Sequence, residues 1–129
     1  DLKSPEGLEI ARRIVSKADI LIENFRPGAM KKLGLDYETL NLENPSLIYC
    51  SLKGFLSGPY EHRTALDEVT QMMGGLAYMT GLPDRPMRAG SSVVDISGGM
   101  FGVIGILAAL QKRNLSGLGE HITSANRVR

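Results

Sequence analysis

Residues 19–25, DILIENF, form a short run of apolar and β-branched side chains with one carboxylate near its end. A run of this length and composition predicts a strand that is buried on both faces, as in a parallel sheet. A second run of this kind, SLIYCSLKGF at residues 46–55, predicts a second buried strand. Between the two runs, Pro27 indicates the start of one helical turn and Asp36 the cap of another. Strand, helix and strand in this order predict a βαβ-like unit and an α/β fold.

Helical patterns lie on both sides of this unit. Before it, Ser4-Pro5 signals a helix start, and apolar residues at helical spacing predict a helix over about 5–17. After it, the sequence predicts a helix from near Leu66 to about Met73, where two glycines stop it. A closely packed, glycine-spaced helix is expected from Ile96 to about Arg113. The segment NLSGLGEHIT then resembles a turn into a final strand.

Composition limits the class of protein. A chain of 129 residues is long enough for one domain, and its 15 basic and 14 acidic side chains argue against general nucleic-acid binding. The single Cys50 excludes an internal disulfide and is typical of a buried strand residue, so we expect a cytoplasmic setting. The longest apolar run has 11 residues where a membrane span needs about 20, so no span is expected. Both ends have the character of internal sequence, and we expect a piece of a longer protein.

Asp95 lies in the stretch SSVVDISGGMFGVIGILAAL, residues 91–110, directly before a long apolar run. Carboxylates are rarely buried without a partner, so its position needs an explanation. One interpretation is an N-cap that accepts the free N–H groups of the first helical turn. Another is a nucleophile, because the positive end of a helix keeps a sheltered carboxylate ionised. The two roles are compatible, and Gly98 and Gly99, which weaken a helix, indicate that a ligand or another helix comes close there.

Two further patterns have a structural and a functional interpretation. Gly102 and Gly105 fall inside the expected helix rather than in a strand-to-helix turn, which favours helix packing over a dinucleotide site. Arg26, Lys31 and Lys32 follow the first predicted strand, where open α/β sheets bind ligands. For these three, a phosphate site and a solvated surface both stay open.

The remaining titratable side chains favour plain structural roles. His62 and His121 have no partner at metal-ligand spacing, so no metal site is expected. Asp67 and Glu68 are adjacent, and neighbours on a helix point about 100° apart, which argues against a paired acid/base site. We therefore expect Asp67 to cap its helix.

Seven segments in a fixed order cover nearly the whole chain: DLKSPEG, ADILIENFRPGAMKKLGL, NPSLIYCSLKGF, GPY, LDEVTQMMGGLAYMTG, VVDISGGMFGVIGILAAL and SGLGEHI. Together they resemble the class III CoA-transferases, or CaiB/BaiF family. This group includes formyl-CoA transferase, carnitine CoA-transferase and the α-methylacyl-CoA racemases. ENFRPG and the segment from Asp95 to GILAAL carry most of the resemblance.

The resemblance implies a fold. It implies an α/β structure with a partial Rossmann-like parallel sheet, flanking helices and a long glycine-spaced helix at its end. A single α/β domain would cover 1–129, with a nucleotide-binding βαβ portion at about 1–60. The catalytic-Asp segment and its packing helix would occupy about 61–129. The chain would be the central fragment of a larger interlocked-dimer fold, so the expected oligomer is a dimer.

The resemblance also implies a reaction. In these transferases the aspartate at the position of Asp95 attacks an acyl-CoA thioester and forms a mixed anhydride. The released CoA thiolate converts the anhydride into an aspartyl-CoA thioester, and an acceptor acid takes over the CoA through a second anhydride. Acyl-CoA and a carboxylic acid are then the substrates, no cofactor is tightly bound, and neither nucleic acid nor a membrane is a partner.

Matching positions in the family imply the CoA contacts. Lys32, which stands where arginine is usual, would face a CoA phosphate with a charge but without the bidentate fork of arginine. Leu66 stands where the racemases have a histidine, and it cannot act as their second acid/base, which disfavours racemase activity. The full set of implied CoA-binding residues is Lys3, Asn24, Phe25, Arg26, Lys32, Thr64, Ala65, Leu66 and Asp67.

Three hypotheses follow for this chain. The first is a CoA-transferase fragment that carries Asp95 and acts within a complete subunit or by complementation. The second is a truncated, catalytically inactive module that binds CoA or self-associates. The third is an acyl-CoA racemase.

Overall fold

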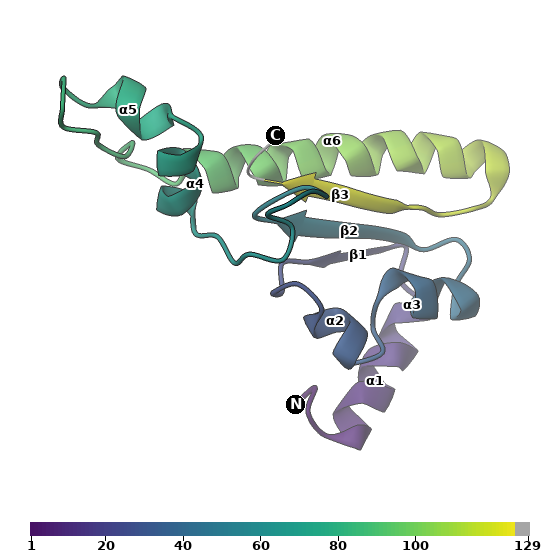
Figure 1. Cartoon of the computed structure of the whole chain (residues 1–129). Coiled ribbons are helices and arrows are strands. Elements are labelled where there is room, and N and C mark those ends of the chain that lie inside the picture. Colours follow the sequence, from purple (N-terminus) through teal and green to yellow (C-terminus); the bar gives the residue numbers. More distant parts are fainter. Residues whose placement is uncertain (126–129) are drawn as a thin grey trace.

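A parallel sheet of three strands forms the centre of the computed structural model, which describes residues 1–125 (Figure 1). The strands are β1 (Ile20–Glu23), β2 (Ile48–Lys53) and β3 (His121–Ala125), in the spatial order β1-β2-β3. Both strand pairs are parallel, with Ile20 beside Ile48 and Tyr49 beside His121. The predicted βαβ-like unit and final strand are confirmed.

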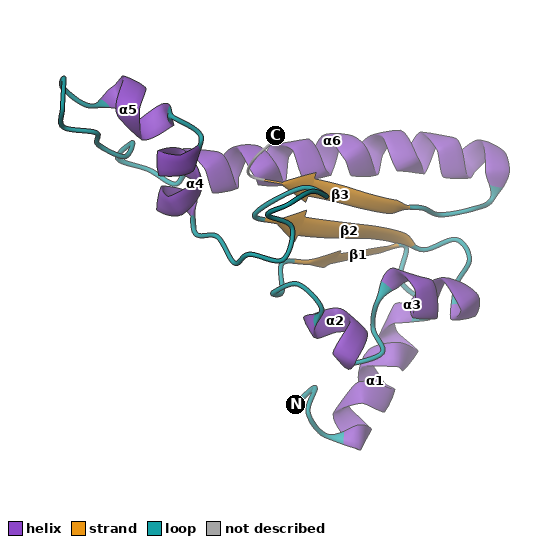
Figure 2. Cartoon of the chain, in the orientation of Figure 1, coloured by secondary structure: helices purple, strands orange, loops and turns teal. Residues whose placement is uncertain are grey.

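Helices cover the two faces of this sheet unequally (Figure 2). Three short helices lie on one face, and one long helix, α6, lies on the other, while α4 and α5 lie beyond the end to which the strands point. The helices are α1 (Pro5–Val15), α2 (Ala29–Lys32), α3 (Tyr37–Glu43), α4 (Asp67–Met73), α5 (Leu76–Thr80) and α6 (Val93–Ser116).

Strand β2 is buried on both faces because its side chains alternate between two apolar clusters. Tyr49, together with Leu47 directly before the strand, packs with α1, α2 and α3, whereas Ile48 and Cys50 pack with α6. The burial predicted for Cys50 is confirmed, and burial raises the pKa of its thiol.

Strand β1 differs from the prediction of burial on both faces. The side chain of Ile22 is 57% exposed. Helix α6 packs on β2 and β3, so Ile22 of β1, the edge strand on the opposite side of β2 from β3, stays uncovered on that face. Glu23, in contrast, is buried on the other face.

Two predicted helix starts are confirmed by the caps that they make. Ser4 Oγ accepts the N–H of Gly7 at 3.0 Å, and Asp36 Oδ1 accepts the N–H of Thr39 at 3.2 Å. Pro27 is an exception: α2 begins after Gly28, whose φ of 77° places a left-handed residue between the proline and the helix.

Two helices depart from the predicted bounds. Helix α5 forms directly after the expected stop at the two glycines, because Gly75 adopts a left-handed conformation and a new helix starts behind it. Helix α6 begins at Val93 rather than Ile96, so Asp95 lies within its first turn and is not its N-cap. The cap residue, Ser92, makes no side-chain cap bond.

Glycines let α6 approach the sheet closely. A Cβ atom at Gly102 would lie 2.9 Å from Leu52 Cδ2, and one at Gly105 would lie 2.8 Å from Ile122 Cγ2. Ser124 Oγ also donates to the carbonyl oxygen of Gly98 at 2.7 Å. Gly102 and Gly105 are therefore helix-packing glycines, as predicted.

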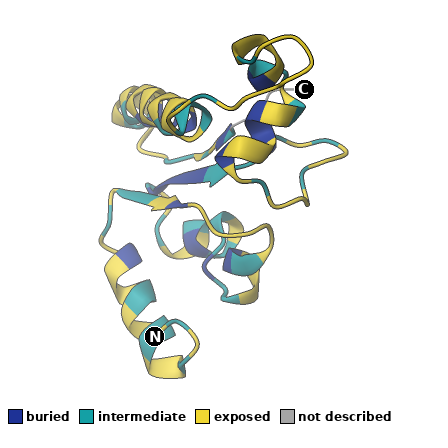
Figure 3. Ribbon diagram, turned by 90° about the vertical axis from the view of Figure 1, so that its left-hand side faces the viewer, coloured by how far each residue is buried: buried dark blue, intermediate teal, exposed yellow. Residues whose placement is uncertain are grey.

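The outer side of α6 is exposed and apolar (Figure 3). We call six of its exposed large apolar side chains the outer face of α6: Ile96, Met100, Phe101, Val103, Ile104 and Leu107. By length and composition alone α6 is apolar enough to cross a membrane, a property that it shares with core helices of soluble proteins. The sequence expectation missed this because it considered only the unbroken apolar run.

Candidate functional site

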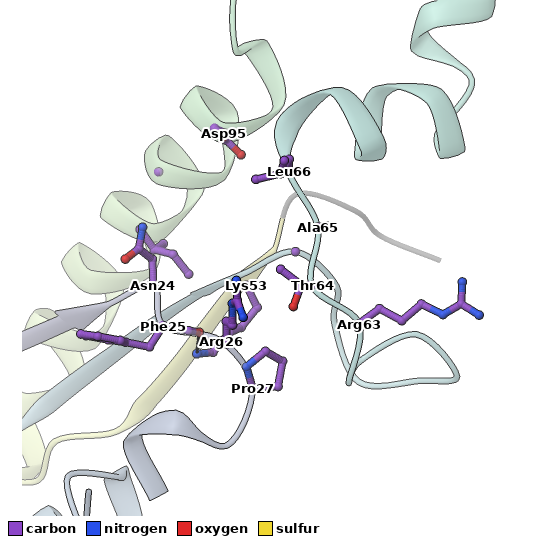
Figure 4. Close-up of a pocket in the computed structure, with 13 residues that line it drawn as sticks. Asn24, Phe25, Arg26, Pro27, Lys53, Arg63, Thr64, Ala65, Leu66 and Asp95 are labelled. Carbon is purple, nitrogen blue, oxygen red and sulfur yellow. Dashed lines mark hydrogen bonds between the residues drawn. The ribbon is translucent and has the colours of Figure 1, made fainter. Parts of the chain in front are cut away.

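A cavity of about 410 Å³ opens at the carboxyl ends of β1 and β2, between the loops that follow these strands and the start of α6 (Figure 4). Open parallel sheets bind their ligands at this edge, and the volume suits a small-molecule ligand. The residues that line it are Asn24, Phe25, Arg26, Pro27, Leu52, Lys53, Gly54, Arg63, Thr64, Ala65, Leu66, Asp95 and Gly99.

A close contact between two loops forms one wall of the cavity. A Cβ atom at Gly54 would lie 2.6 Å from Ala65 Cβ, so only glycine lets the segment 63–66 rest against the end of β2. This contact holds Thr64, Ala65 and Leu66 at the cavity, whereas the side chain of Arg63 extends away from the other labelled residues (Figure 4).

Asp95 reaches the cavity from the first turn of α6, and Figure 4 shows its carboxylate directed toward Leu66. The N-terminal turn of a helix stabilises a negative charge. The sequence expectation of a sheltered carboxylate is wrong for the described residues, because Asp95 is exposed at the cavity rim. Gly99, one turn further along, also lines the cavity, and a Cβ atom there would meet nothing within 4 Å. The predicted room beside Asp95 is therefore present at Gly99, while Gly98 is buried toward β3.

Asp67 provides the cap that Asp95 was expected to provide. Its Oδ2 accepts the backbone N–H groups of Val94 at 2.9 Å and Asp95 at 3.1 Å. Asp67 is the first residue of α4, with Leu66 at the cap position, so its carboxylate caps α6 rather than its own helix. The prediction that Asp67 caps a helix is confirmed, but the capped helix is α6 and not α4, to which Asp67 belongs.

Gln71, one turn along α4, completes this connection. Its Nε2 donates to Asp67 Oδ1 and to the carbonyl oxygen of Ser91, and its Oε1 accepts the N–H of Ala89 at 2.7 Å. Gln71 is fully buried. The loop that leads into α6 is thus fixed to α4 by one amide side chain, and Asp95 follows directly from that loop.

Burial by itself raises the pKa of the Asp67 carboxyl, yet the pKa lies below its ordinary value. Hydrogen bonds from the backbone of Asp95, the side chain of Gln71 and the backbone of Val94 outweigh the burial, and Arg88 adds a smaller effect. Asp67 is therefore held as an anion beside the N-terminus of α6.

An ion pair between a lining lysine and a buried glutamate lies at the other wall of the cavity. Lys53 Nζ is 2.6 Å from Glu23 Oε1, and the Glu23 side chain is only 3% exposed. Lys53 lines the cavity at the carboxyl end of β2. Sequence reasoning missed Lys53, although its position at the end of a predicted parallel strand was a usable signal.

The structure gathers most of the predicted site residues and leaves others outside. Lys3 and Lys32 are exposed and do not line the cavity; Lys3 precedes α1, and Lys32 is the last residue of α2. Asp67 lies behind Leu66, with its carboxylate turned to the backbone of α6. The predicted residues that line the cavity are Asn24, Phe25, Arg26, Thr64, Ala65, Leu66 and Asp95.

The two histidines lie outside the cavity lining. His121 stacks on Tyr37, with ring centroids 5.2 Å apart, and its Nε2 is 2.9 Å from Ser51 Oγ. The Nε2 atom of His62 lies 3.2 Å from Oε1 of Glu61. Within residues 1–125, no group of three or more His, Cys, Asp or Glu side chains is placed to hold a metal ion.

Comparison with known proteins identifies the family. The family described as CoA-transferase family III matches residues 1–126. This chain belongs to CoA-transferase family III. Its resemblance to the class III CoA-transferases, predicted from the seven segments, is confirmed.

Two CoA-transferases show how similar this chain is to its relatives and how much of their length it covers. The succinate–glutarate CoA-transferase of Agrobacterium fabrum is 48% identical over 127 residues, which are 97% of this chain and 32% of the relative. The acetyl-CoA:oxalate CoA-transferase of Acetobacter aceti is 45% identical over 125 residues, which are 95% of this chain and 32% of the relative. The chain thus spans about a third of the length of these relatives.

The fold of this CoA-transferase family III chain is also that of solved structures. A CaiB/BaiF family protein from Brucella suis superposes with a TM-score of 0.93 at 46% identity, over 98% of this chain and 34% of that protein. The predicted α/β fold, a parallel sheet with flanking helices and a long glycine-spaced helix, is confirmed, and it matches one part of that longer protein.

Proposed function

We propose that this chain provides the nucleophile and part of the CoA site of an enzyme that transfers CoA between an acyl-CoA thioester and a carboxylic acid. One observation carries the proposal: Asp95 lies on the rim of the cavity at the carboxyl edge of the sheet, in a chain of CoA-transferase family III. CoA is a substrate in this proposal, and no tightly bound cofactor is required.

The cavity has groups suited to an acyl-CoA. Arg26 supplies a cation and Asn24 an amide on one wall, while Leu66 and Phe25 supply apolar surface for the pantetheine arm and the acyl group. Lys3 and Lys32 lie outside the cavity, and their proposed role is a distant contact with the nucleotide phosphates.

In the first half of the reaction, a carboxylate oxygen of Asp95 attacks the thioester carbonyl carbon. The C–S bond breaks, the sulfur leaves as CoA thiolate, and a mixed anhydride joins Asp95 to the acyl group. The thiolate then attacks the aspartyl carbonyl carbon. The anhydride C–O bond breaks, the donor acid leaves as a carboxylate, and an aspartyl-CoA thioester remains.

In the second half, the acceptor carboxylate attacks the aspartyl thioester and again expels the thiolate. This step forms a second anhydride, between Asp95 and the acceptor. The thiolate attacks the acceptor carbonyl carbon, the C–O bond breaks, and the new acyl-CoA forms as the Asp95 carboxylate is regenerated. One thioester and one carboxylate enter, and one thioester and one carboxylate leave, so no net proton or electron is needed.

The described geometry supports the first attack. Asp95 lies in the first turn of α6, where the helix N-terminus stabilises negative charge, and Gly99 leaves open space beside it. Asp67 holds the backbone N–H of Asp95, which fixes the start of the helix that carries the nucleophile. Asp67 acts here through backbone position and not as an acid or base.

A trapping experiment tests the proposal. The chain is incubated with several acyl-CoA thioesters and hydroxylamine, which converts an aspartyl anhydride or thioester into a hydroxamate, and peptides are analysed by mass spectrometry. We expect a hydroxamate at Asp95 and none in Asp95→Asn. Asp84, an exposed aspartate outside the cavity lining, is the internal control. An unmodified Asp95 in folded protein contradicts the proposed nucleophile.

A second candidate is a CoA-binding module without catalysis. One observation favours it: the Asp95 side chain is exposed at the cavity rim. Binding of CoA by calorimetry together with an unmodified Asp95 in the trapping experiment would support it. The racemase hypothesis lacks this support, since Leu66 supplies no acid/base group at the cavity.

A homo-oligomer is part of the proposal. The outer face of α6 is apolar and exposed in the single chain, as expected for a surface that another part of an assembly covers. The cytoplasmic location stays a prediction from the sequence.

A further inference from the structure

Four consecutive residues that follow β1, from Asn24 to Pro27, all line the cavity. No helix or strand includes them, and α2 begins only after Gly28. A binding loop of this kind needs other contacts to fix its backbone, because each unrestrained residue loses conformational entropy when a ligand orders it.

One ion pair supplies such contacts at the centre of this loop. Glu23 Oε2 accepts the backbone N–H of Phe25 at 2.8 Å. Lys53 Nζ donates to the carbonyl oxygen of the same residue, Phe25, at 3.0 Å. Both backbone polar groups of Phe25 are therefore bound by two side chains that also bind each other at 2.6 Å.

The sheet brings these two side chains together. Glu23 is the last residue of β1 and Lys53 the last of β2, and the register pairs Glu23 with Ser51. Side chains two positions apart on a strand share a face, so Lys53 lies on the same face as Glu23, one step further toward the cavity. The Glu23 side chain is 3% exposed and that of Lys53 is 21% exposed. With so little contact with water, each charge needs the opposite charge beside it to offset the cost of burial.

We propose that Glu23 and Lys53 are positioning residues, which hold Phe25 by its backbone and so fix the loop from Asn24 to Pro27 in the form that binds ligand. This inference rests on the proposed function in one respect, the choice of CoA as ligand. The pair acts through the loop, because Glu23 is buried behind the cavity and Lys53 is engaged by Glu23 and by Phe25.

The test must separate positioning from stability. Removal of one charge alone leaves the other buried and unpaired, which can unfold the chain. The double variant Glu23→Leu/Lys53→Met removes both charges while keeping similar volumes, a change that stable folds tolerate. Lys112→Met/Glu120→Leu removes a second Lys–Glu pair, with 2.5 Å between its charged atoms, at the far end of α6 and serves as the matched control.

Two measurements are made on each protein: amide hydrogen exchange at Phe25, relative to the buried Ile48 amide, and CoA affinity by calorimetry. In Glu23→Leu/Lys53→Met we expect the exchange rate of the Phe25 amide to rise at least tenfold and that of the Ile48 amide to stay unchanged. We expect the affinity for CoA to fall about tenfold. Lys53→Arg keeps the positive charge and a hydrogen-bond donor, so we expect this variant to retain most of the protection of the Phe25 amide against exchange. The control pair should change neither quantity.

The outcomes separate this inference from the proposed function. Unchanged Phe25 exchange with weaker CoA binding would show that Lys53 meets the ligand directly, which overturns the positioning role. Faster exchange with unchanged affinity would overturn it as well. A wild-type chain that binds no CoA would contradict the proposed function, while Phe25 exchange would still decide whether the ion pair holds the loop.

Discussion

Asp67 Oδ2 accepts the backbone N–H of Asp95 at 3.1 Å, although 28 positions separate the two residues along the chain. The contact joins the start of α4 to the start of α6. It makes the position of the proposed nucleophile depend on a buried carboxylate that lies outside the cavity lining.

Asp67→Ala should destabilise the chain by about 2 kcal/mol, because two helix N–H groups lose their acceptor and Gln71 loses a partner. Urea unfolding followed by circular dichroism measures this change. Glu68→Ala is the matched control: Glu68 is adjacent, and its exposed pair with Arg88 at 3.4 Å should contribute less than about 1 kcal/mol. Equal losses in the two variants would contradict the capping role of Asp67.

The stabilisation from the Asp67 charge should depend on pH. Its pKa is below the ordinary 3.8 in the folded chain, so acid protonates the unfolded form first. The contribution is therefore fully present above pH 3.8 and is lost as the pH falls through the folded pKa. The stability difference between wild type and Asp67→Asn, measured by urea unfolding, should shrink as the pH falls below about 4. A stability difference that grows as the pH falls would contradict the lowered pKa of Asp67.

His121 should titrate below its ordinary pKa of 6.5, mainly because burial disfavours the charged ring. Glu38 and Glu23 oppose this shift and Lys53 adds to it. The lowered pKa means that the unfolded chain binds the proton first, so this group contributes stability above pH 6.5 that is lost below it. Proton NMR of the imidazole should give a midpoint below 6.5; a higher midpoint would mean that the two glutamates dominate.

Alanine at two glycines of α6 should have opposite effects. Gly99→Ala should stabilise the chain by up to about 1 kcal/mol, because helix propensity rises and the Cβ atom meets no neighbour. Gly105→Ala should lose that gain and destabilise by about 1 kcal/mol, since its Cβ atom would lie 2.8 Å from Ile122 Cγ2. Thermal unfolding of both variants measures the difference in stability. Stabilisation by both substitutions would contradict the close packing of α6 on β3 at Gly105.

The outer face of α6 should drive self-association of the single chain. Phe101→Glu places a charge among its exposed apolar side chains and should lower the molar mass measured by light scattering at a given concentration. Ile14→Glu on α1, which is also exposed, is the control and should leave the mass unchanged. A wild-type chain that stays monomeric at high concentration would contradict this prediction.

Much of the fold could be predicted because its signals are local. The cap at Ser4 reaches only to Gly7, and the cap at Asp36 only to Thr39. Likewise, the short apolar runs predict β1 and β2 without knowledge of their neighbours. The exposure of Ile22 could not be predicted this way, because it depends on which strands α6 covers.

The candidate site shows the same division. The βαβ order, the ligand-binding edge at the ends of two strands and the place of Asp95 near the start of a glycine-spaced helix could all be predicted from the sequence. The cap that Asp67 makes on this helix and the contacts of Glu23 and Lys53 with Phe25 become visible only in the folded chain. Helix caps and strand runs involve neighbouring residues, whereas these hydrogen bonds join separate elements whose distance is set by sheet register and helix packing.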